Sequence, residues 1–337
     1  MYIFIIAFLG LLFYGSKYIK RDYVKEPLAY QNTIALRGIC AIEIVIGHIG
    51  VASRNPWLFI NRKAGVLIVG VFFFLSGYGL MYSLKKKENY MLNFFKSRIP
   101  KILIPALLVY FIYYVMEMVS TPAGSRILVT IKYFSLWEFS EKLNWYVTEL
   151  LFMYVLFWLL YRNLKIRTAN IATSVVCICF VVACYFGGAG NTWYGSTLCF
   201  PLGILFCCHE AEVLSLIKRK YILFLAVSFI MTGIGIFLFF INEHSLVSNV
   251  IGRSVASLSF CICVFTVLLK VKIGNRITNW VGKMSYELFL IHEIFVFQDK
   301  FDMNVLLYSV CAFAFSVFFG YILHKCDEKI FLKIIKK

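Results

Sequence analysis

Apolar residues in this chain are gathered into long runs that are separated by short polar segments. Each run has about 17 to 22 residues, the length that an α-helix needs to cross a hydrocarbon layer of about 30 Å. Helices are the default spanning element because they satisfy their own backbone polar groups. The pattern predicts an all-α, polytopic membrane helix bundle of eleven spans, at residues 3–19, 33–52, 64–83, 99–119, 144–161, 169–186, 193–208, 220–241, 250–270, 281–299 and 304–323.

Composition agrees with this pattern. Of the 337 residues, 61% are hydrophobic and only 15% are charged, whereas a soluble domain carries roughly 25% charged residues. The connections are too short for a separate soluble domain. The first run has neither a basic segment before it nor a small-residue cleavage site after it, so we predict a retained membrane helix and not a signal peptide.

Basic residues fall on every second connection, and this alternation predicts the orientation. Lysine and arginine accumulate on the cytoplasmic side of membrane proteins, which predicts an outside N-terminus and an inside C-terminus. The formal net charge of +17 is then mostly a topology signal, and the expected environment is a lipid bilayer. Nucleic acid is not an expected partner because the charge is scattered. The basic clusters lie at Lys17–Lys25, Lys85–Lys101, Arg162–Arg167, Lys218–Lys220, Lys270–Arg276 and Lys325–Lys337.

Two ionisable residues share one face of the second predicted helix. Arg37 and His48 are eleven residues apart, which is three helical turns plus about 20° and a rise of about 16 Å. Ionisable groups inside a membrane are costly and usually face a bundle interior. Taken alone, Arg37 also fits a snorkelling anchor and His48 a packed histidine, but the shared face favours a joint function. Glu43 points about 140° away from His48.

Five segments combine polar and aromatic residues in a characteristic order: LRGICAIEIVIGH (36–48), GVFFFLSGYGL (70–80), SRIPKILIP (97–105), NWYVTELLFMY (144–154) and GKMSYELFLIHEIF (282–295). In this order they resemble the motifs of the acyltransferase-3 family, the integral membrane acyltransferases that O-acylate bacterial surface sugars. The first motif is an arginine, ten residues and a histidine. In the third, Lys101 replaces the family's second arginine.

The resemblance implies a ten-helix acyltransferase core, preceded here by one extra N-terminal transmembrane helix. It divides the chain into that helix with its linker (1–30), the membrane acyltransferase domain (31–325) and a basic cytoplasmic tail (326–337). It implies transfer of an acyl group, most often acetyl, from cytoplasmic acyl-CoA to a hydroxyl of a cell-surface polysaccharide or lipid-linked sugar. It also implies the bacterial plasma (inner) membrane. Acetyl-CoA is the expected donor and a carbohydrate the expected acceptor.

This chemistry suggests roles for the buried polar groups. An attacking hydroxyl loses its proton, and a histidine with an ordinary pKa near 6.5 is suited to accept it, so we expect His48 to be the general base. The coenzyme A phosphates need cations at the cytoplasmic edge, where Arg37, Arg98 and Lys101 are placed. Arg98 and Lys101 also fit the general excess of cytoplasmic positive charge. Lys101 is the weaker candidate because it departs from the family pattern.

Further polar residues have less defined roles. Glu149 is expected to be buried, either as a catalytic hydrogen-bond acceptor or as a structural one. His292 should lie at a depth similar to that of His48. Arg253 stands at an outer helix end, where it could meet the acceptor. Trp145, Ser285, Tyr286, His292 and Arg253 are candidates for substrate contact or for polar contacts between helices. His324 is expected to be solvated.

Two rival hypotheses remain open. A transporter or flippase could use the same intramembrane groups, and a broken helix pair or an inverted repeat would favour it; the sequence shows neither. An enzyme of the same fold could transfer another acyl group, such as succinyl. No metal site is expected, because cysteine pairs such as Cys207/Cys208 lack zinc-ligand spacing.

Overall fold

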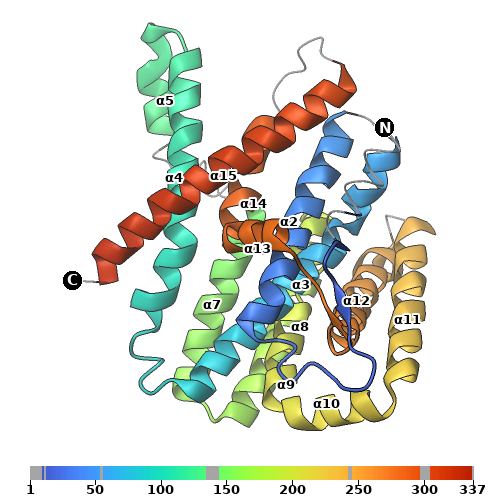
Figure 1. Cartoon of the computed structure of the whole chain (residues 1–337). Coiled ribbons are helices and arrows are strands. Elements are labelled where there is room, and N and C mark those ends of the chain that lie inside the picture. Colours follow the sequence, from blue (N-terminus) through green and yellow to red (C-terminus); the bar gives the residue numbers. More distant parts are fainter. Residues whose placement is uncertain are drawn as a thin grey trace.

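The computed structural model describes residues 10, 13–53, 56–133, 144–241, 245–296 and 304–335, and these residues are almost entirely helical (Figure 1). The α-helices are α2 (Tyr30–Ala52), α3 (Pro56–Lys86), α4 (Phe94–Ser120), α5 (Arg126–Tyr133), α7 (Trp145–Asn163), α8 (Ile166–Phe186), α9 (Cys199–Cys208), α10 (Glu210–Arg219), α11 (Tyr221–Ile241), α12 (Arg253–Leu268), α13 (Arg276–Lys283), α14 (Ser285–Val296) and α15 (Val305–Ile335). Shorter turns are the 3₁₀-helices η1 (Ala123–Ser125) and η2 (Asn191–Trp193) and the π-helix η3 (Val247–Gly252).

The expected polytopic all-α bundle is confirmed. Within the described residues, seven helical segments are long and apolar enough to cross a membrane, or eight if the bent pair α9–α10 is one span. The total of eleven spans and the orientation in the cell stay predictions. The seven segments are Tyr30–Ala52, Ala64–Lys86, Phe94–Ser120, Ile166–Phe186, Tyr221–Phe240, Ser248–Leu268 and Val305–Leu332.

Three expected spans differ from the observed elements. In place of a helix over 193–208, α9 begins only at Cys199 and turns by 93° into α10. The expected helix over 281–299 is divided at Met284 into α13 and α14. Most of the expected span 3–19 lies outside the described residues, and its end, Lys17–Tyr18, forms strand β1.

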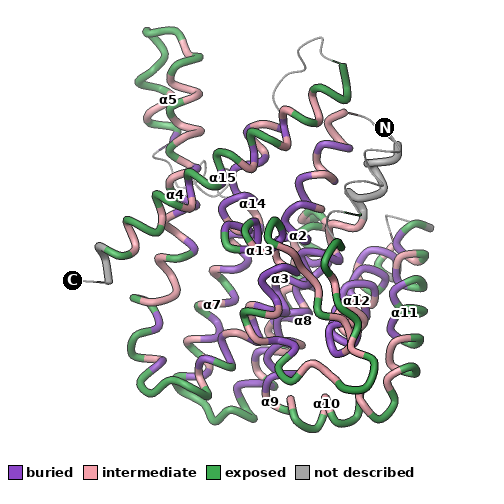
Figure 2. The backbone as a smooth tube through the Cα atoms, in the orientation of Figure 1, coloured by how far each residue is buried: buried purple, intermediate pink, exposed green. Residues whose placement is uncertain are grey.

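The helices α2 and α3 form the centre of the bundle. The apolar window of α2 is 72% buried and that of α3 67%, against 17% for α15. Buried backbone follows these helices in Figure 2, while α11 and α15 are largely exposed, as expected for helices that face lipid. The central position of α2 places Arg37 and His48 inside the protein.

One end of the bundle carries the last turn of α3, with Lys85 and Lys86, and the loop that follows it, and α2 begins there. We call it the basic end. At this end β1 pairs antiparallel with β2 (Val271–Lys272), which fastens the N-terminal segment to the chain after α12. The 31-residue helix α15 crosses the bundle obliquely and brings its last turns toward the basic end (Figure 1).

A close helix crossing fixes the backbone next to Arg37. A Cβ atom on Gly38 would collide with the backbone oxygen of Thr278, and one on Gly282 with that of Ile34. The two glycines therefore let α2 and α13 approach at backbone distance. This contact holds the start of α2 against the segment that leads into α14.

Candidate active site

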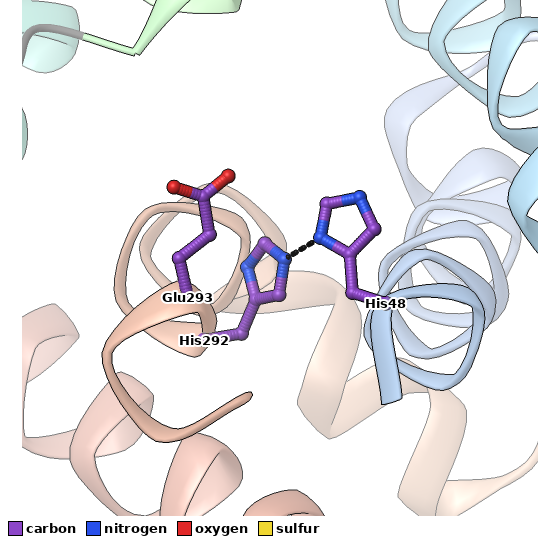
Figure 3. Close-up of side chains that lie close together, drawn as sticks. All are labelled: His48, His292 and Glu293. Atoms are coloured by element: carbon purple, nitrogen blue, oxygen red, sulfur yellow. Dashed lines mark hydrogen bonds between the residues drawn. The ribbon is translucent and has the colours of Figure 1, made fainter. Parts of the chain in front are cut away.

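His48 of α2 and His292 of α14 form a hydrogen-bonded pair in the half of the bundle away from the basic end. Nδ1 of His48 lies 2.7 Å from Nε2 of His292, and the ring centroids are 4.8 Å apart. The rings face each other across the gap between the two helices (Figure 3). Both histidines belong to predicted site motifs, and the expectation that they lie at similar depth is confirmed.

The contacts of His292 determine which nitrogen carries each proton. Its Nδ1 lies 2.6 Å from the carbonyl oxygen of Phe289. A carbonyl only accepts, so Nδ1 of His292 is the protonated nitrogen and donates. In the neutral ring Nε2 is then an acceptor, and Nδ1 of His48 donates to it. Nε2 of neutral His48 is consequently its basic nitrogen, the form that a general base needs.

A carboxylate lies beside this pair. Glu293 follows His292 on α14, and its Oε1 accepts a hydrogen bond from Nδ2 of Asn144, the N-cap residue of α7, at 3.3 Å. One ligand atom from each of His48, His292 and Glu293 lies within 4.8 Å of the others. The sequence motif contains Glu293, but its place in the site could not be read from spacing alone.

These three side chains are a donor set that suits a transition metal. Two nitrogens bound tetrahedrally to one zinc ion at about 2.0–2.1 Å would lie roughly 3.3 Å apart. The observed separation of 2.7 Å is that of a hydrogen bond. The geometry therefore favours a histidine pair that shares a proton over two histidines that bind one ion.

A cavity of about 430 Å³ opens among α2, α3, α4, α7, α14 and α15 toward the basic end. Such a volume is within the usual range for ligand sites. Arg37, Arg98 and Lys101, the three cations expected to hold phosphates, all line it. The structure thus brings these residues together from two helices.

Arg37 is a partly buried cation of this cavity. Its guanidinium lies 5.3 Å from the ring centroid of Tyr30. Its Nε is buried, and among the described residues no side chain or backbone group accepts from it. A buried donor of a cation without an acceptor is costly. Arg37 is therefore well placed for an anion that enters the cavity.

Arg98 and Lys101 are held by other contacts. Nε of Arg98 donates to the Tyr90 hydroxyl at 2.9 Å and Nη2 donates to Ser83 Oγ at 2.6 Å. These two hydrogen bonds hold the guanidinium of Arg98 in one orientation. Lys101 stands over the ring of Phe331, 4.8 Å from its centroid.

The cavity wall formed by α14 and α15 carries acidic groups. His324 was expected to be solvated, and this expectation is wrong: it lines the cavity, with Nδ1 at 2.8 Å from Glu287 Oε1. The reason is that α15 continues beyond the predicted boundary at residue 323 to Ile335. The same extension brings Asp327 and Phe331 into the wall.

Ser285 and Tyr286 also line the cavity, which supports their place in the site. The Tyr286 hydroxyl donates to the Ile102 carbonyl at 2.9 Å, so it joins α14 to α4. Trp145 begins α7 beside Asn144, and its ring meets that of Tyr146 edge-on at 6.1 Å. Trp145 thus belongs to the helix start that contacts Glu293.

Two predicted residues lie in other environments. Glu149 is 1% exposed, and its Oε1 accepts from Thr197 Oγ1 at 2.7 Å; among the described residues it has no bond to the histidine pair. Arg253 begins α12, donates to Asn249 Oδ1 at 3.2 Å and stacks over Phe239 of α11. A catalytic role for Glu149 and an acceptor contact for Arg253 stay predictions.

Comparison with known proteins now decides the family. The family model described as an acyltransferase domain, of the acyltransferase-3 family, matches residues 31–325. The chain belongs to the acyltransferase-3 family. No curated protein and no solved structure matches it.

As a member of this family, the protein is a multi-pass membrane acyltransferase. The cavity and the histidine pair lie toward opposite ends of α2.

Proposed function

We propose that this acyltransferase moves an acetyl group from cytoplasmic acetyl-CoA to a hydroxyl of a cell-surface polysaccharide or lipid-linked sugar. The observation that carries the proposal is the position of Arg37 and His48 on one continuous helix. Arg37 lies in a cavity that opens at the basic end, and His48 lies about 16 Å further along α2.

The basic end of the cavity suits the nucleotide part of coenzyme A. Arg37, Arg98 and Lys101 offer charge to phosphate oxygens, and arginine forks bind such oxygens in pairs. Phosphates would supply the acceptor that buried Nε of Arg37 lacks among the described residues. Tyr30 and Phe331 add aromatic surface beside two of these cations.

The histidine pair suits the chemical step. The acceptor hydroxyl oxygen attacks the thioester carbonyl carbon while its proton passes to Nε2 of His48. The imidazolium still donates from Nδ1 to His292, now in a charge-assisted hydrogen bond, and Glu293 lies close enough to favour the positive charge. Collapse of the tetrahedral intermediate breaks the C–S bond, and the coenzyme A thiolate takes the proton back from His48.

This arrangement explains how an acyl group could cross the membrane. The extended pantetheine arm of the donor would run along α2 from Arg37 toward His48. The acceptor would enter from the opposite end. The acetyl group then reaches the exterior while coenzyme A stays in the cytoplasm, in the orientation that the basic loops predict. We also propose a location in the bacterial plasma membrane, which the family resemblance implies.

Sealed membrane vesicles of known sidedness test this function. Radiolabelled acetyl-CoA supplied on the basic side should be consumed, with release of coenzyme A on that side and appearance of acetyl ester on a glycan acceptor on the other. The Arg162→Ala variant serves as a control and should transfer acetyl as the wild type does, because Arg162 is a cation of α7 that stacks on Trp158 away from the cavity. Acetyl transfer only when donor and acceptor share the outer side would contradict the proposal.

One structural feature bears on the transporter hypothesis, namely the 93° bend between α9 and α10. The second helix of that pair carries Glu210, Glu212, Lys218 and Arg219 at its two ends, and Ile217 is its one buried residue. A surface helix of this kind differs from the paired half-helices at a transporter's midplane. A transporter would also consume no thioester.

A further inference from the structure

The cavity ends in aromatic side chains on the side that faces the histidine pair. On α3, α7 and α14, the lining residue furthest from the basic end is Phe72, Tyr146 or Phe289, respectively. Nearer the basic end the lining of the same helices is mixed and includes Ser76, Ser285 and further rings such as Tyr154. Among the lining residues of these three helices, Phe72, Tyr146 and Phe289 thus lie nearest the histidine pair.

Phe289 lies between the cavity and the His48–His292 pair. Its ring lines the cavity and packs against Tyr146, with centroids 4.8 Å apart. The same ring is 5.8 Å from the ring of His292, and the Phe289 carbonyl accepts from His292 Nδ1. Among the described residues that line the cavity, neither His48 nor His292 is present. A donor in the cavity therefore meets the rings before it meets the base.

The acyl group is the leading end of the donor, because it is bound to the sulfur at the tip of the pantetheine arm. It must pass the rings before the thioester carbonyl reaches His48. Tyr146 and Phe289 are each only 5% exposed, so on the proposed path an acyl group would have to displace their rings. A packed interior resists added volume, and a difference of one methylene is already felt there.

We propose that Tyr146 and Phe289, together with Phe72, form an aromatic filter that admits a two-carbon acyl group to His48 and excludes longer ones. The filter rests on the proposed function, since it acts on an acyl-CoA donor. It acts through the side-chain rings. The positioning of His292 depends on the backbone carbonyl of Phe289, which a side-chain substitution retains.

The filter is tested directly by the acyl-chain profile, that is, by how efficiently each variant uses acyl-CoA donors of different chain length. Wild type and Phe289→Ala are compared in membranes with acetyl-, propionyl-, butyryl- and hexanoyl-CoA, and ester formation on the acceptor is read by mass spectrometry. Discrimination by one methylene in an apolar pocket is about 10- to 200-fold. We therefore expect the butyryl-to-acetyl ratio of kcat/KM to rise at least about tenfold in Phe289→Ala, and also to rise in Tyr146→Ala.

Two variants serve as matched controls. Phe73→Leu shortens a fully buried ring that lies 5.2 Å from Tyr146 but does not line the cavity. Tyr146→Phe removes the hydroxyl and keeps the ring. Both control variants should keep the acyl-chain profile of the wild type. The ratio is measured within each preparation, so the fraction of folded protein cancels, and Phe289→Leu supplies a milder change if the alanine variant does not fold.

The possible outcomes separate the filter from the function on which it rests. If wild type transfers acetyl and the Phe289 and Tyr146 variants keep an unchanged profile, the filter is wrong and the function stands. A profile that broadens equally in Phe73→Leu would also overturn it, since general loosening would then be the cause. If wild type transfers no acyl group from any of the four donors, the proposed function itself fails.

Discussion

His292 holds His48 through a 2.7 Å hydrogen bond between residues 244 positions apart in the sequence. The bond crosses from α14 to α2, and the Phe289 carbonyl fixes its direction. His292 is 0% exposed, so it cannot itself receive a proton from a substrate without rearrangement. We assign it the positioning of His48.

The first prediction concerns this positioning role. His292→Phe removes the acceptor for His48 Nδ1, so the base loses its orientation. We expect kcat to fall by roughly 10- to 100-fold, by analogy with the loss of the partner that orients a metal-bound histidine. KM for acetyl-CoA should stay near the wild-type value. His292→Gln, whose amide oxygen can still accept, should recover part of kcat; a loss that appears only in KM would contradict the assignment.

The second prediction concerns the donor site. Arg37→Ala and Arg98→Ala should each weaken acetyl-CoA binding by on the order of 1.5–3 kcal/mol, the value of a charge-assisted hydrogen bond. Arg98→Lys should restore binding only in part, because an ammonium cannot reproduce the forked contact. Isothermal titration with the detergent-solubilised protein measures this, and Arg162→Ala is the control. Unchanged affinity in both alanine variants would place the phosphates elsewhere.

The third prediction concerns the helix crossing next to Arg37. Gly38→Ala puts a methyl group against the Thr278 backbone oxygen, so α2 and α13 must separate. We expect a loss of about 1–3 kcal/mol in stability, as for other overpacked sites, together with weaker donor binding. Gly79→Ala is the matched control, because Gly79 also lies within a helix, but a Cβ added there would meet no neighbouring group within 4 Å among the described residues. Equal thermal shifts in the two variants would contradict this account.

The fourth prediction concerns Glu149. Glutamine can keep the hydrogen bond from Thr197, so a structural role predicts that Glu149→Gln retains acetyl transfer within a few-fold of wild type. Thr197→Val should lower the free energy of unfolding by about 1–3 kcal/mol, which is the cost of leaving a buried polar group without its partner. A loss of about 100-fold or more in Glu149→Gln, with normal folding, would instead support a catalytic role.

The sequence predicted the features that depend on one helix at a time. The apolar run over 33–52 and the 11-residue spacing of Arg37 and His48 both follow helical geometry, and α2 carries them as expected. The depth of His292 could likewise be counted from the start of its predicted helix. These inferences need only length, period and orientation.

Features that depend on tertiary contacts could not be predicted. No pattern shows that Phe289 orients His292, or that Asn144 bonds Glu293, because these partners come from different turns or helices. His324 was misassigned because the charged end of α15 resembles a solvated tail, although the helix continues and packs over the cavity. The bend after α9 was missed because apolar runs give the length of a segment but not its direction.

The central claim is that His48 is the base and that the donor binds independently of it. The most direct measurement compares His48→Ala with wild type in the same membranes, using radiolabelled acetyl-CoA for transfer and titration for donor affinity. His209→Ala, which changes an exposed histidine paired with Glu212, is the control. We predict a fall in transfer of about 10²–10⁴-fold with donor affinity near that of wild type. Acetyl transfer by His48→Ala at the wild-type rate would contradict the account.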